Sequence, residues 1–302
     1  VSPEHHHTQP EDFTGLLHYL RRLGFSEEEL EYSGLVKRSA KGNLYDIFRH
    51  RVMVPIIDVR GAIIAFGGRV LDDSKPKYIN SPETMVYKKS RTLFALNVAK
   101  KSPNKRYILC EGYMDVISMH EAGFDTAVCA CGTALTPEQV KLLTEYADEV
   151  VLSYDSDEAG QKATARSLAM FTEADIKVRV LSYQGAKDPD EFIKKYGKER
   201  FAMLLDGSAD PTEFQLKKAA ANYDLRDSAG RLNYLKDAID ILARKGVTPT
   251  ARDVYAGRLA EETGVGKKAI LEQMNDVLRS TQRRDRRKEQ RDLAVLFENM
   301  ES

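Results

Sequence analysis

The chain lacks the features that mark secreted, membrane and fibrous proteins. Its 302 residues include three cysteines, which are too few for a disulfide framework, and Cys129 and Cys131 do not form a C-x-x-C pair. Charged residues interrupt every apolar stretch well before the ~18 residues that a membrane-spanning helix needs. No charged segment followed by an apolar one opens the sequence, so we expect no export signal. These absences predict a soluble protein of a reducing, cytoplasmic compartment with no membrane partner.

Net charge is also absent, because 46 Lys and Arg balance 46 Asp and Glu. The charges are nevertheless unevenly distributed. Between Arg49 and Arg106 there are 13 basic residues and four acidic ones. The acids of the following segment lie in three groups, within 111–115, 155–158 and 188–191. This pattern favours a bound polyanion with metal ions beside it, and ordinary variation of surface charge is the alternative.

The length predicts two or three folded parts. We expect the fold class to be α/β (mixed α+β), in four segments: a linker over 1–12 that contains His5–His7, an N-terminal basic α/β subdomain over 13–103, a central parallel-sheet domain over 104–198 and a C-terminal helical subdomain over 199–302.

The basic subdomain shows both helical and strand patterns. Leucines at helical spacing predict a helix between Phe13 and Gly24, and Ser26 is placed to cap a second one. Branched apolar runs then predict a β-hairpin over 52–57 and 62–66. The pair Gly67-Gly68 is interpreted either as a tight bend after the strand or as a close approach of backbone to a polyanion.

Strands and helices alternate regularly in the central segment. The predicted strands are 107–110, 126–129, 150–154 and 178–182, and the predicted helices between them are 115–121, 137–146 and 158–171. This alternation is typical of a parallel sheet with crossover helices. After about residue 200 the pattern is helical only, with breaks at 248–250 and 264–266.

Acidic residues follow three of the predicted parallel strands, where ligands of such sheets bind. Glu111 directly follows the first strand and Asp155 the third, and Asp157 faces the same way as Asp155 in an extended segment. Asp188 and Asp190 repeat this spacing after the fourth strand. These carboxylates would repel one another unless hard cations such as Mg²⁺ neutralise them, and two such ions promote phosphoryl transfer. The alternative is that the acids only cap helices.

Several motifs together resemble one family. The central segment contains Glu111-Gly-Tyr-Met-Asp115, Gly132-Thr-Ala-Leu-Thr136, Tyr154-Asp-Ser-Asp-Glu-Ala-Gly160 and Lys187-Asp-Pro-Asp-Glu-Phe192, which resemble the TOPRIM domain of bacterial DnaG-type primases. The preceding segment contains Arg51-Val-Met-Val-Pro55, Phe66-Gly-Gly-Arg69 and Pro76-Lys-Tyr-Ile-Asn-Ser-Pro-Glu-Thr84, which resemble the basic half of the primase polymerase core. The resemblance spans about residues 45–195.

The resemblance implies a DNA primase, a DNA-directed RNA polymerase that makes short RNA primers from NTPs on single-stranded DNA at the bacterial replication fork. It assigns catalysis to Glu111, Asp155 and Asp157, and metal contact to these three with Asp188 and Asp190. The cofactor is two or more Mg²⁺ ions, with Mn²⁺ as a substitute. The residues expected to contact nucleotide or nucleic acid are Arg51, Arg69, Lys77, Asn80, Lys89 and Lys187.

Other expectations follow from what the resemblance leaves out. No Cys/His quartet is present, so we expect no zinc in this fragment, and the segment Gly264-Val-Gly-Lys267 lacks the spacing of a P-loop. Complete primases carry a zinc-binding domain and a domain that docks the replicative helicase. We expect both to be absent from this chain and the core to be monomeric. The alternatives are a TOPRIM strand-cleaving enzyme (a topoisomerase fragment or a nuclease) and a nucleic-acid-binding scaffold without catalysis.

Overall fold

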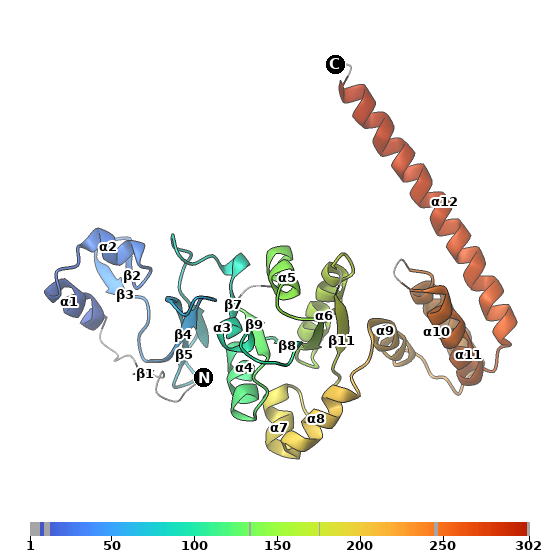
Figure 1. Ribbon diagram of the computed structural model, residues 1–302, viewed down its shortest axis with the longest axis horizontal. Helices are drawn as coiled ribbons and strands as arrows, with labels where there is room; N and C mark the ends of the chain where they lie inside the picture. Colours follow the sequence, from blue (N-terminus) through green and yellow to red (C-terminus); the bar gives the residue numbers. More distant parts are fainter. Residues whose placement is uncertain (1–6, 9–12, 133, 175, 245–246, 301–302) are drawn as a thin grey trace. The chain divides into compact units, whose positions relative to one another are not determined.

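The computed structural model of the chain describes residues 7–8, 13–132, 134–174, 176–244 and 247–300. It divides into two compact units, Val1–Ser208 and Ala209–Ser302, which are described separately (Figure 1). Within the segment expected to be a linker, His7–Thr8 forms a short strand, β1. The rest of that segment lies outside the described residues.

The first unit begins with a small helical layer over a hairpin. Helices α1 (Gly15–Arg22) and α2 (Glu27–Tyr32) confirm the two predicted helices, and Ser26 caps α2 in a capping box with Glu29. Strands β2 (Val36–Arg38) and β3 (Leu44–Asp46) pair antiparallel and were not predicted. One apolar residue from each element forms a separate small core: Leu17, Leu30, Val36 and Leu44.

An antiparallel sheet follows, with the strand order β1-β4-β5-β6. It is built on the predicted hairpin of β4 (Arg51–Ile57) and β5 (Ile63–Val70), to which β6 (Tyr78–Asn80) adds. Strand β5 continues through Gly67 and Gly68, so these glycines do not form a bend after the strand. A Cβ atom on Gly68 would lie 2.9 Å from the Phe48 ring. Glycine is therefore required there by close packing inside the sheet.

The central sheet has the order β11-β10-β8-β9-β7. Its four parallel strands confirm the predicted alternation: β8 (Arg106–Cys110), β9 (Ala127–Ala130), β10 (Glu149–Ser153) and β11 (Lys177–Val180). Strand β7 (Leu93–Phe94) pairs antiparallel at one edge. Residues of β8 to β10 are buried along nearly their whole length, which is typical of strands covered by helices on both faces.

Helices cover both faces of this sheet. Figure 1 shows α5 (Pro137–Thr144) and α6 (Glu158–Phe171) on one side of the sheet, and α4 (Tyr113–Glu121), α7 (Pro189–Tyr196) and α8 (Lys198–Asp206) on the other. Before the sheet, the chain forms a 3-10 turn, η2 (Lys89–Arg91), and a short helix, α3 (Leu96–Ala99). The parallel strands and their helices thus form a doubly wound layer structure.

Helix α8 belongs to the first unit. Its Phe201 and Leu205 are buried in the same core as Ile108 and Val151 of the central sheet, and the Phe201 ring packs against Phe192 of α7 and against Phe124. The compact unit therefore ends at Ser208, and the predicted limits of the central domain, 104 and 198, stay predictions.

The second unit is helical, as predicted. It consists of α9 (Pro211–Ala220), α10 (Ser228–Leu242), α11 (Pro249–Thr263) and α12 (Lys267–Met300). The predicted breaks fall where Thr248 caps α11 and where Gly264 ends it in the left-handed conformation. Leu242, Ala256 and Ile270 lie at the centre of its core. No helix in the described part of either unit has the length and apolar character needed to cross a bilayer.

Candidate active site

The predicted acidic residues lie at the carboxyl edge of the central sheet. Strand β9 extends the sheet from β8 in one direction, whereas β10 and β11 extend it in the other. The topological switch point therefore lies between β8 and β10, where ligands of open α/β sheets bind. Glu111 directly follows β8, and Asp155 lies two residues after β10. Because Cys110 and Ser153 are register partners at the ends of these strands, the two acids flank this point.

The geometry brings Glu111 and Asp155 together. The backbone N–H of Asp155 donates a hydrogen bond to Glu111 Oε2 over 3.3 Å. Partial burial is the largest cause that raises the pKa of Asp155, and repulsion from Glu111, Asp188 and Asp157 adds to it. Together they raise this pKa to about 6. No side chain in the described part of the chain donates a hydrogen bond to its carboxylate. The charge of Lys187 acts in the opposite direction but does not offset these effects, so the ionised form of Asp155 is disfavoured in the folded chain.

Asp157 and Asp188 each cap a helix through one of their two carboxylate oxygens. Asp157 Oδ1 accepts the backbone N–H of Gly160 at 2.8 Å and caps α6, and Asp188 Oδ1 accepts that of Glu191 at 2.7 Å and caps α7. The capping role considered as an alternative is thus confirmed for both. It does not exclude ligand binding, because each cap bond uses one carboxylate oxygen, although the second oxygen of Asp188 lies 3.6 Å from Lys187 Nζ. These caps also fix both side chains at the edge of the sheet.

Asp190 is more fully engaged within the protein. Its Oδ1 accepts a hydrogen bond from Ser118 Oγ at 2.6 Å, and its Oδ2 pairs with Lys194 Nζ at 2.7 Å. These partners outweigh burial and lower the pKa of Asp190. Of the five predicted acids, Asp190 has the least free oxygen to offer a cation.

Asp115 was quoted within a motif but was not predicted as a site residue. It lies in the first turn of α4, where its Oδ2 accepts the backbone N–H of Gly112 at 3.1 Å. Burial, with repulsion from Asp155, Asp188 and Asp190, raises its pKa to about 7. Its position four residues after Glu111, one helical turn further on, is the signal that could have placed it at this edge.

The acidic side chains suit a hard divalent cation in their chemistry. All of them offer carboxylate oxygen, which Mg²⁺ and Mn²⁺ prefer, and a positive ion would favour the ionised form of Asp155. Among the residues that the structure describes, no three Asp, Glu, His or Cys side chains converge closely enough to enclose an ion. A cation bound at this edge would therefore need water or substrate oxygens to complete its coordination.

Close packing holds the Asp155 backbone. Helix α6 begins so near to it that a Cβ atom on Gly160 would lie 2.2 Å from the Asp155 carbonyl oxygen. Such a contact is impossible for any other residue without a shift of the backbone. Gly160 therefore fixes the acidic segment against the helix that Asp157 caps.

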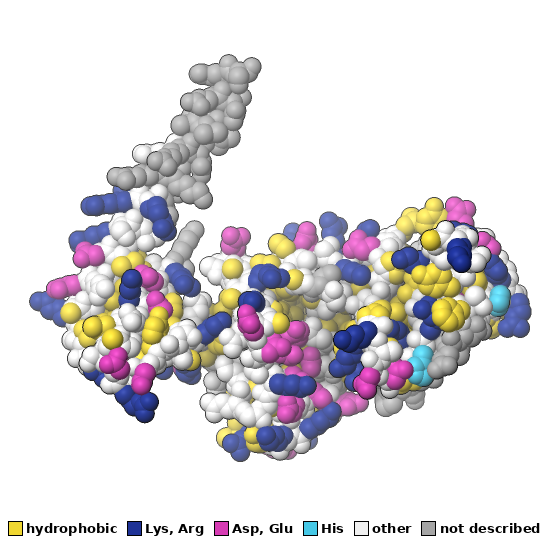
Figure 2. All heavy atoms as spheres, turned by 180° about the vertical axis from the view of Figure 1, so that it is seen from behind, with side chains coloured by type: hydrophobic (Ala, Val, Ile, Leu, Met, Phe, Trp, Pro, Cys, Tyr) yellow, Lys and Arg dark blue, Asp and Glu magenta, His cyan; other side chains and the backbone are white. Residues whose placement is uncertain are grey.

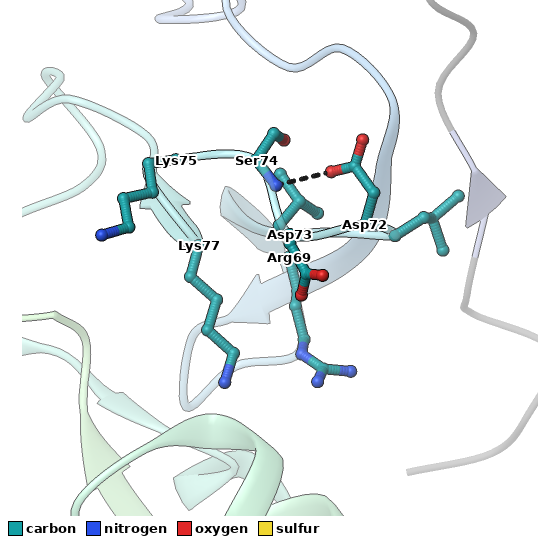
Figure 3. Close-up of a pocket in the computed structure, with 8 residues that line it drawn as sticks. Arg69, Asp72, Asp73, Ser74, Lys75 and Lys77 are labelled. Atoms are coloured by element: carbon teal, nitrogen blue, oxygen red, sulfur yellow. Dashed lines mark hydrogen bonds between the residues drawn. The ribbon is translucent and has the colours of Figure 1, made fainter.

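Two of the predicted basic residues line a hollow on the antiparallel sheet. Arg69 of β5 and Lys77, which precedes β6, line a hollow of ≈ 700 Å³, and its other polar lining residues are Asp72, Asp73, Ser74 and Lys75. Figure 3 shows the Arg69 and Lys77 side chains extending in the same direction. The positive charge of Arg69 counteracts the rise that Asp190 causes in the pKa of Lys194, which indicates that Arg69 lies near the acidic edge.

Arg51 does not lie on this surface. It is buried, and its guanidinium donates hydrogen bonds to the backbone carbonyls of Gly68, Pro76 and Lys77 at 2.8–3.2 Å. The prediction that Arg51 contacts a nucleotide or nucleic acid is therefore corrected, because its donors are used to hold the β5–β6 connection. The sequence pattern could not distinguish a buried arginine of a strand from an exposed one.

The remaining predicted residues occupy different places. Asn80 of β6 reaches the carboxyl end of β9, since a Cβ atom on Gly132 would lie 2.0 Å from Asn80 Nδ2, and its Oδ1 is buried without a hydrogen bond. Lys187 is exposed, with Nζ 3.6 Å from Asp188 Oδ2. Lys89 begins η2, and its backbone carbonyl accepts Gln139 Nε2 of α5 at 2.8 Å. Figure 2 shows acidic side chains gathered near the middle of one face with basic ones beside them.

Three protein families match successive parts of this chain. Residues 8–100 match the N-terminal domain of the DNA primase catalytic core, residues 108–193 match the Toprim-like family, and residues 212–267 match the DnaB-helicase binding domain of primase. A solved DNA primase domain from Pseudomonas aeruginosa is 32% identical, with a TM-score of 0.69 over 89% of this chain and 86% of that one. The chain belongs to the bacterial DNA primase family.

Other members of this family extend the comparison. The RNA polymerase domain of the Mycobacterium tuberculosis primase DnaG, solved in complex with double-stranded DNA, is 32% identical, with a TM-score of 0.76 over 86% of this chain and 84% of that one. The DNA primase of Clostridium acetobutylicum is 42% identical over 87% of this chain, and that of Deinococcus radiodurans is 36% identical over 87%. This chain spans 44% and 47% of these two primases, so it covers about half the length of the curated relatives it matches.

The family matches confirm one expectation and correct another. The match of residues 8–100 to a primase core disfavours the strand-cleaving alternative, which shares only the Toprim-like part. The expectation that the helicase-docking domain is absent from this chain is wrong, because residues 212–267 match a family described as helicase-binding. Their helical pattern carried no chemical signature, so the sequence reasoning assigned them no role.

Proposed function

We propose that this chain is a template-directed RNA polymerase that makes short primers from NTPs on single-stranded DNA. The observation that carries the proposal is the set of acids at the switch point of the central sheet. Burial, together with repulsion from Glu111, Asp188 and Asp157, raises the pKa of Asp155 to about 6, and Arg69 and Lys77 extend from the adjoining sheet. Nucleotidyl transfer requires positioning and neutralisation of charge, which such a set of residues supplies.

Asp155, Asp157 and Asp188 would hold the divalent cations, with Asp190 and Asp115 as nearby acids. We propose two or more Mg²⁺ ions, for which Mn²⁺ substitutes. When bound, such ions neutralise the charge of the transferring phosphoryl group and favour ionisation of the attacking hydroxyl. The helix caps hold the carboxylates of Asp157 and Asp188 in place before substrate arrives, which reduces the reorganisation needed during the reaction.

Glu111 is the proposed acceptor of the proton from the 3′-hydroxyl of the primer. Its Oε2 is oriented by the backbone N–H of Asp155, and its side chain is exposed at the edge of the sheet. A general base must reach the proton it removes, and an exposed carboxylate beside the cation ligands meets that requirement.

The basic residues are proposed to hold phosphates of NTP, template and primer. Arg69 suits bidentate contact with a phosphate, whereas Lys77, Lys89 and Lys187 act as point charges. Asn80 is proposed to act near the nucleotide, although in this structure its Oδ1 is buried and its Nδ2 lies against Gly132. Arg51 is excluded from this set because its guanidinium is buried.

The test is a gel assay with labelled ribonucleotides, a single-stranded template of mixed sequence and a titration of Mg²⁺. Asp155→Ala is expected to lower primer yield by at least about 100-fold, the loss typical when one group that stabilises transition-state charge is removed. The matched control is Glu158→Ala, since Glu158 is an exposed acid of α6 that pairs only with Lys162. Primer synthesis by a folded Asp155→Ala protein at the control rate would overturn the proposal.

The second unit is proposed to contact the replicative helicase, because residues 212–267 match a family described as binding it. We also propose that the chain acts at the replication fork in the cytoplasm and that its catalytic unit works as a monomer. Co-sedimentation of the full chain with the purified helicase tests the contact. Loss of binding when residues 209–302 are removed is expected, and unchanged binding would contradict it.

A further inference from the structure

Helix α12 changes character abruptly along its length. Its first part packs on the second unit, where Ile270 and Met274 are buried and Val277 and Leu278 pack against the same core. From 279 to 292 there is then no apolar residue, and this segment contains seven basic residues and three acidic ones. The helix nevertheless continues to Met300. We call residues 279–292 the basic arm.

The basic arm gains nothing from packing of apolar side chains. A helix that is polar on all sides is stabilised by ion pairs along its length or by a partner. The excess of basic residues in the basic arm places like charges one turn apart, as at Arg279 and Arg283, which is destabilising. In its described part, the single ion pair is that of Arg279 with Asp276, at 3.9 Å. A partner of opposite charge would relieve this repulsion.

The described arginines of the basic arm are accessible. Arg279, Arg283, Arg284 and Arg286 are exposed, and the last three have no hydrogen bond or ion pair to any side chain that the structure describes. Arg279, Arg283 and Arg286 follow the i, i+4, i+7 spacing and thus share one face of the helix. Figure 1 shows this half of α12 extending away from α10 and α11, so the face is not covered within its own unit.

We propose that the basic arm binds the phosphate backbone of nucleic acid, independently of sequence and outside the active site. Arginine offers forked donors that match phosphate oxygens. From Arg279 to Arg286 the helix rises about 10 Å, and a DNA duplex carries about six phosphate charges over that length. Three arginines on one face can therefore each meet a phosphate. This site lies in the second unit and needs no catalysis, so it goes beyond the proposed polymerase function.

The experiment measures binding of the full chain to a short duplex of mixed sequence at several salt concentrations, with EDTA and without nucleotides. The arm variant carries R279Q, R283Q and R286Q, because Gln has nearly the helix propensity of Arg. The control carries K218Q, K236Q and K268Q, which remove the same charge from exposed positions of the same unit. In the arm variant, removal of three phosphate contacts should make the slope of log K for duplex binding against log salt less steep by about 2–3. The control variant should change this slope by less than about one.

Equal slopes for the arm variant and the control would overturn the proposal and leave an acidic protein as the candidate partner. A third variant with R279K, R283K and R286K retains the charges and is expected to retain the slope, and a loss in this variant would also overturn it. Circular dichroism verifies that all three retain their helix content. Asp155→Ala is expected to bind the duplex like the wild type, so failure of this proposal and failure of the polymerase function are separately visible.

Discussion

Replacement of Asp115 by Asn is predicted to remove a pH-dependent penalty on folding. Burial, more than repulsion from Asp155, Asp188 and Asp190, raises the pKa of the Asp115 carboxyl from 3.8 to about 7 in the folded chain. Because the pKa of Asp115 is higher in the folded than in the unfolded chain, its contribution to stability is fully present below pH 3.8, the unfolded pKa. It is lost as the pH rises through about 7. Asn remains neutral and keeps an oxygen that accepts the Gly112 N–H.

The expected magnitude follows from linkage. Each pH unit between the two pKa values lowers stability by about 1.4 kcal/mol, so the penalty grows by about 2–3 kcal/mol from about pH 5 to about pH 8. Urea unfolding of the full chain in EDTA measures it. The stability of Asp115→Asn relative to wild type should rise by this amount over the interval, and exposed Asp73→Asn is the control for removal of one negative charge elsewhere. Parallel pH curves for Asp115→Asn and wild type would refute the reasoning.

Two further perturbations test the packing around the site. Gly160→Ala should destabilise the first unit by about 1–3 kcal/mol, because the added Cβ would overlap the Asp155 carbonyl. The control is Gly257→Ala in α11, where the nearest atom is 4.0 Å away, and it should stabilise the protein by about 1 kcal/mol. Equal effects of the two substitutions in thermal unfolding would contradict this. Arg51→Met should cost roughly 1–3 kcal/mol, because the carbonyls of Gly68, Pro76 and Lys77 lose a charged donor, without changing the salt slope of single-strand binding. Lys77→Gln should lower that slope by about 0.7 at unchanged stability, and the reverse pattern would restore a phosphate role for Arg51.

The central domain could be predicted from the sequence because its signals are local. Strands such as Val150–Leu152 are continuous apolar runs, and helices such as α5 begin with Thr136 and Pro137, which fix a helix start. The placement of Glu111 and Asp155 at one edge followed from the parallel topology alone. The acids therefore could be located before any coordinates were known.

The parts that could not be predicted depend on contacts between distant segments. The burial of Arg51 depends on carbonyls up to 26 residues away, and the position of Gly68 inside a strand depends on Phe48. Short strands such as β6 are set by pairing with β5 and lack a periodic signal of their own. The second unit is a helical core without chemical motifs, so its match to a helicase-binding family was unreadable from its pattern.

The central claim is that the acids at the switch point hold a divalent cation, and titration of the protein with Mn²⁺ monitored by electron paramagnetic resonance tests it most directly. The double variant Asp155→Asn with Asp188→Asn is compared with the control Glu158→Gln with Glu173→Gln, which removes the same charge from exposed positions. We predict that wild type and control bind Mn²⁺ and that the Asp variant binds it at least about tenfold more weakly, a loss of about 1.4 kcal/mol. Equal binding by all three proteins would contradict the account.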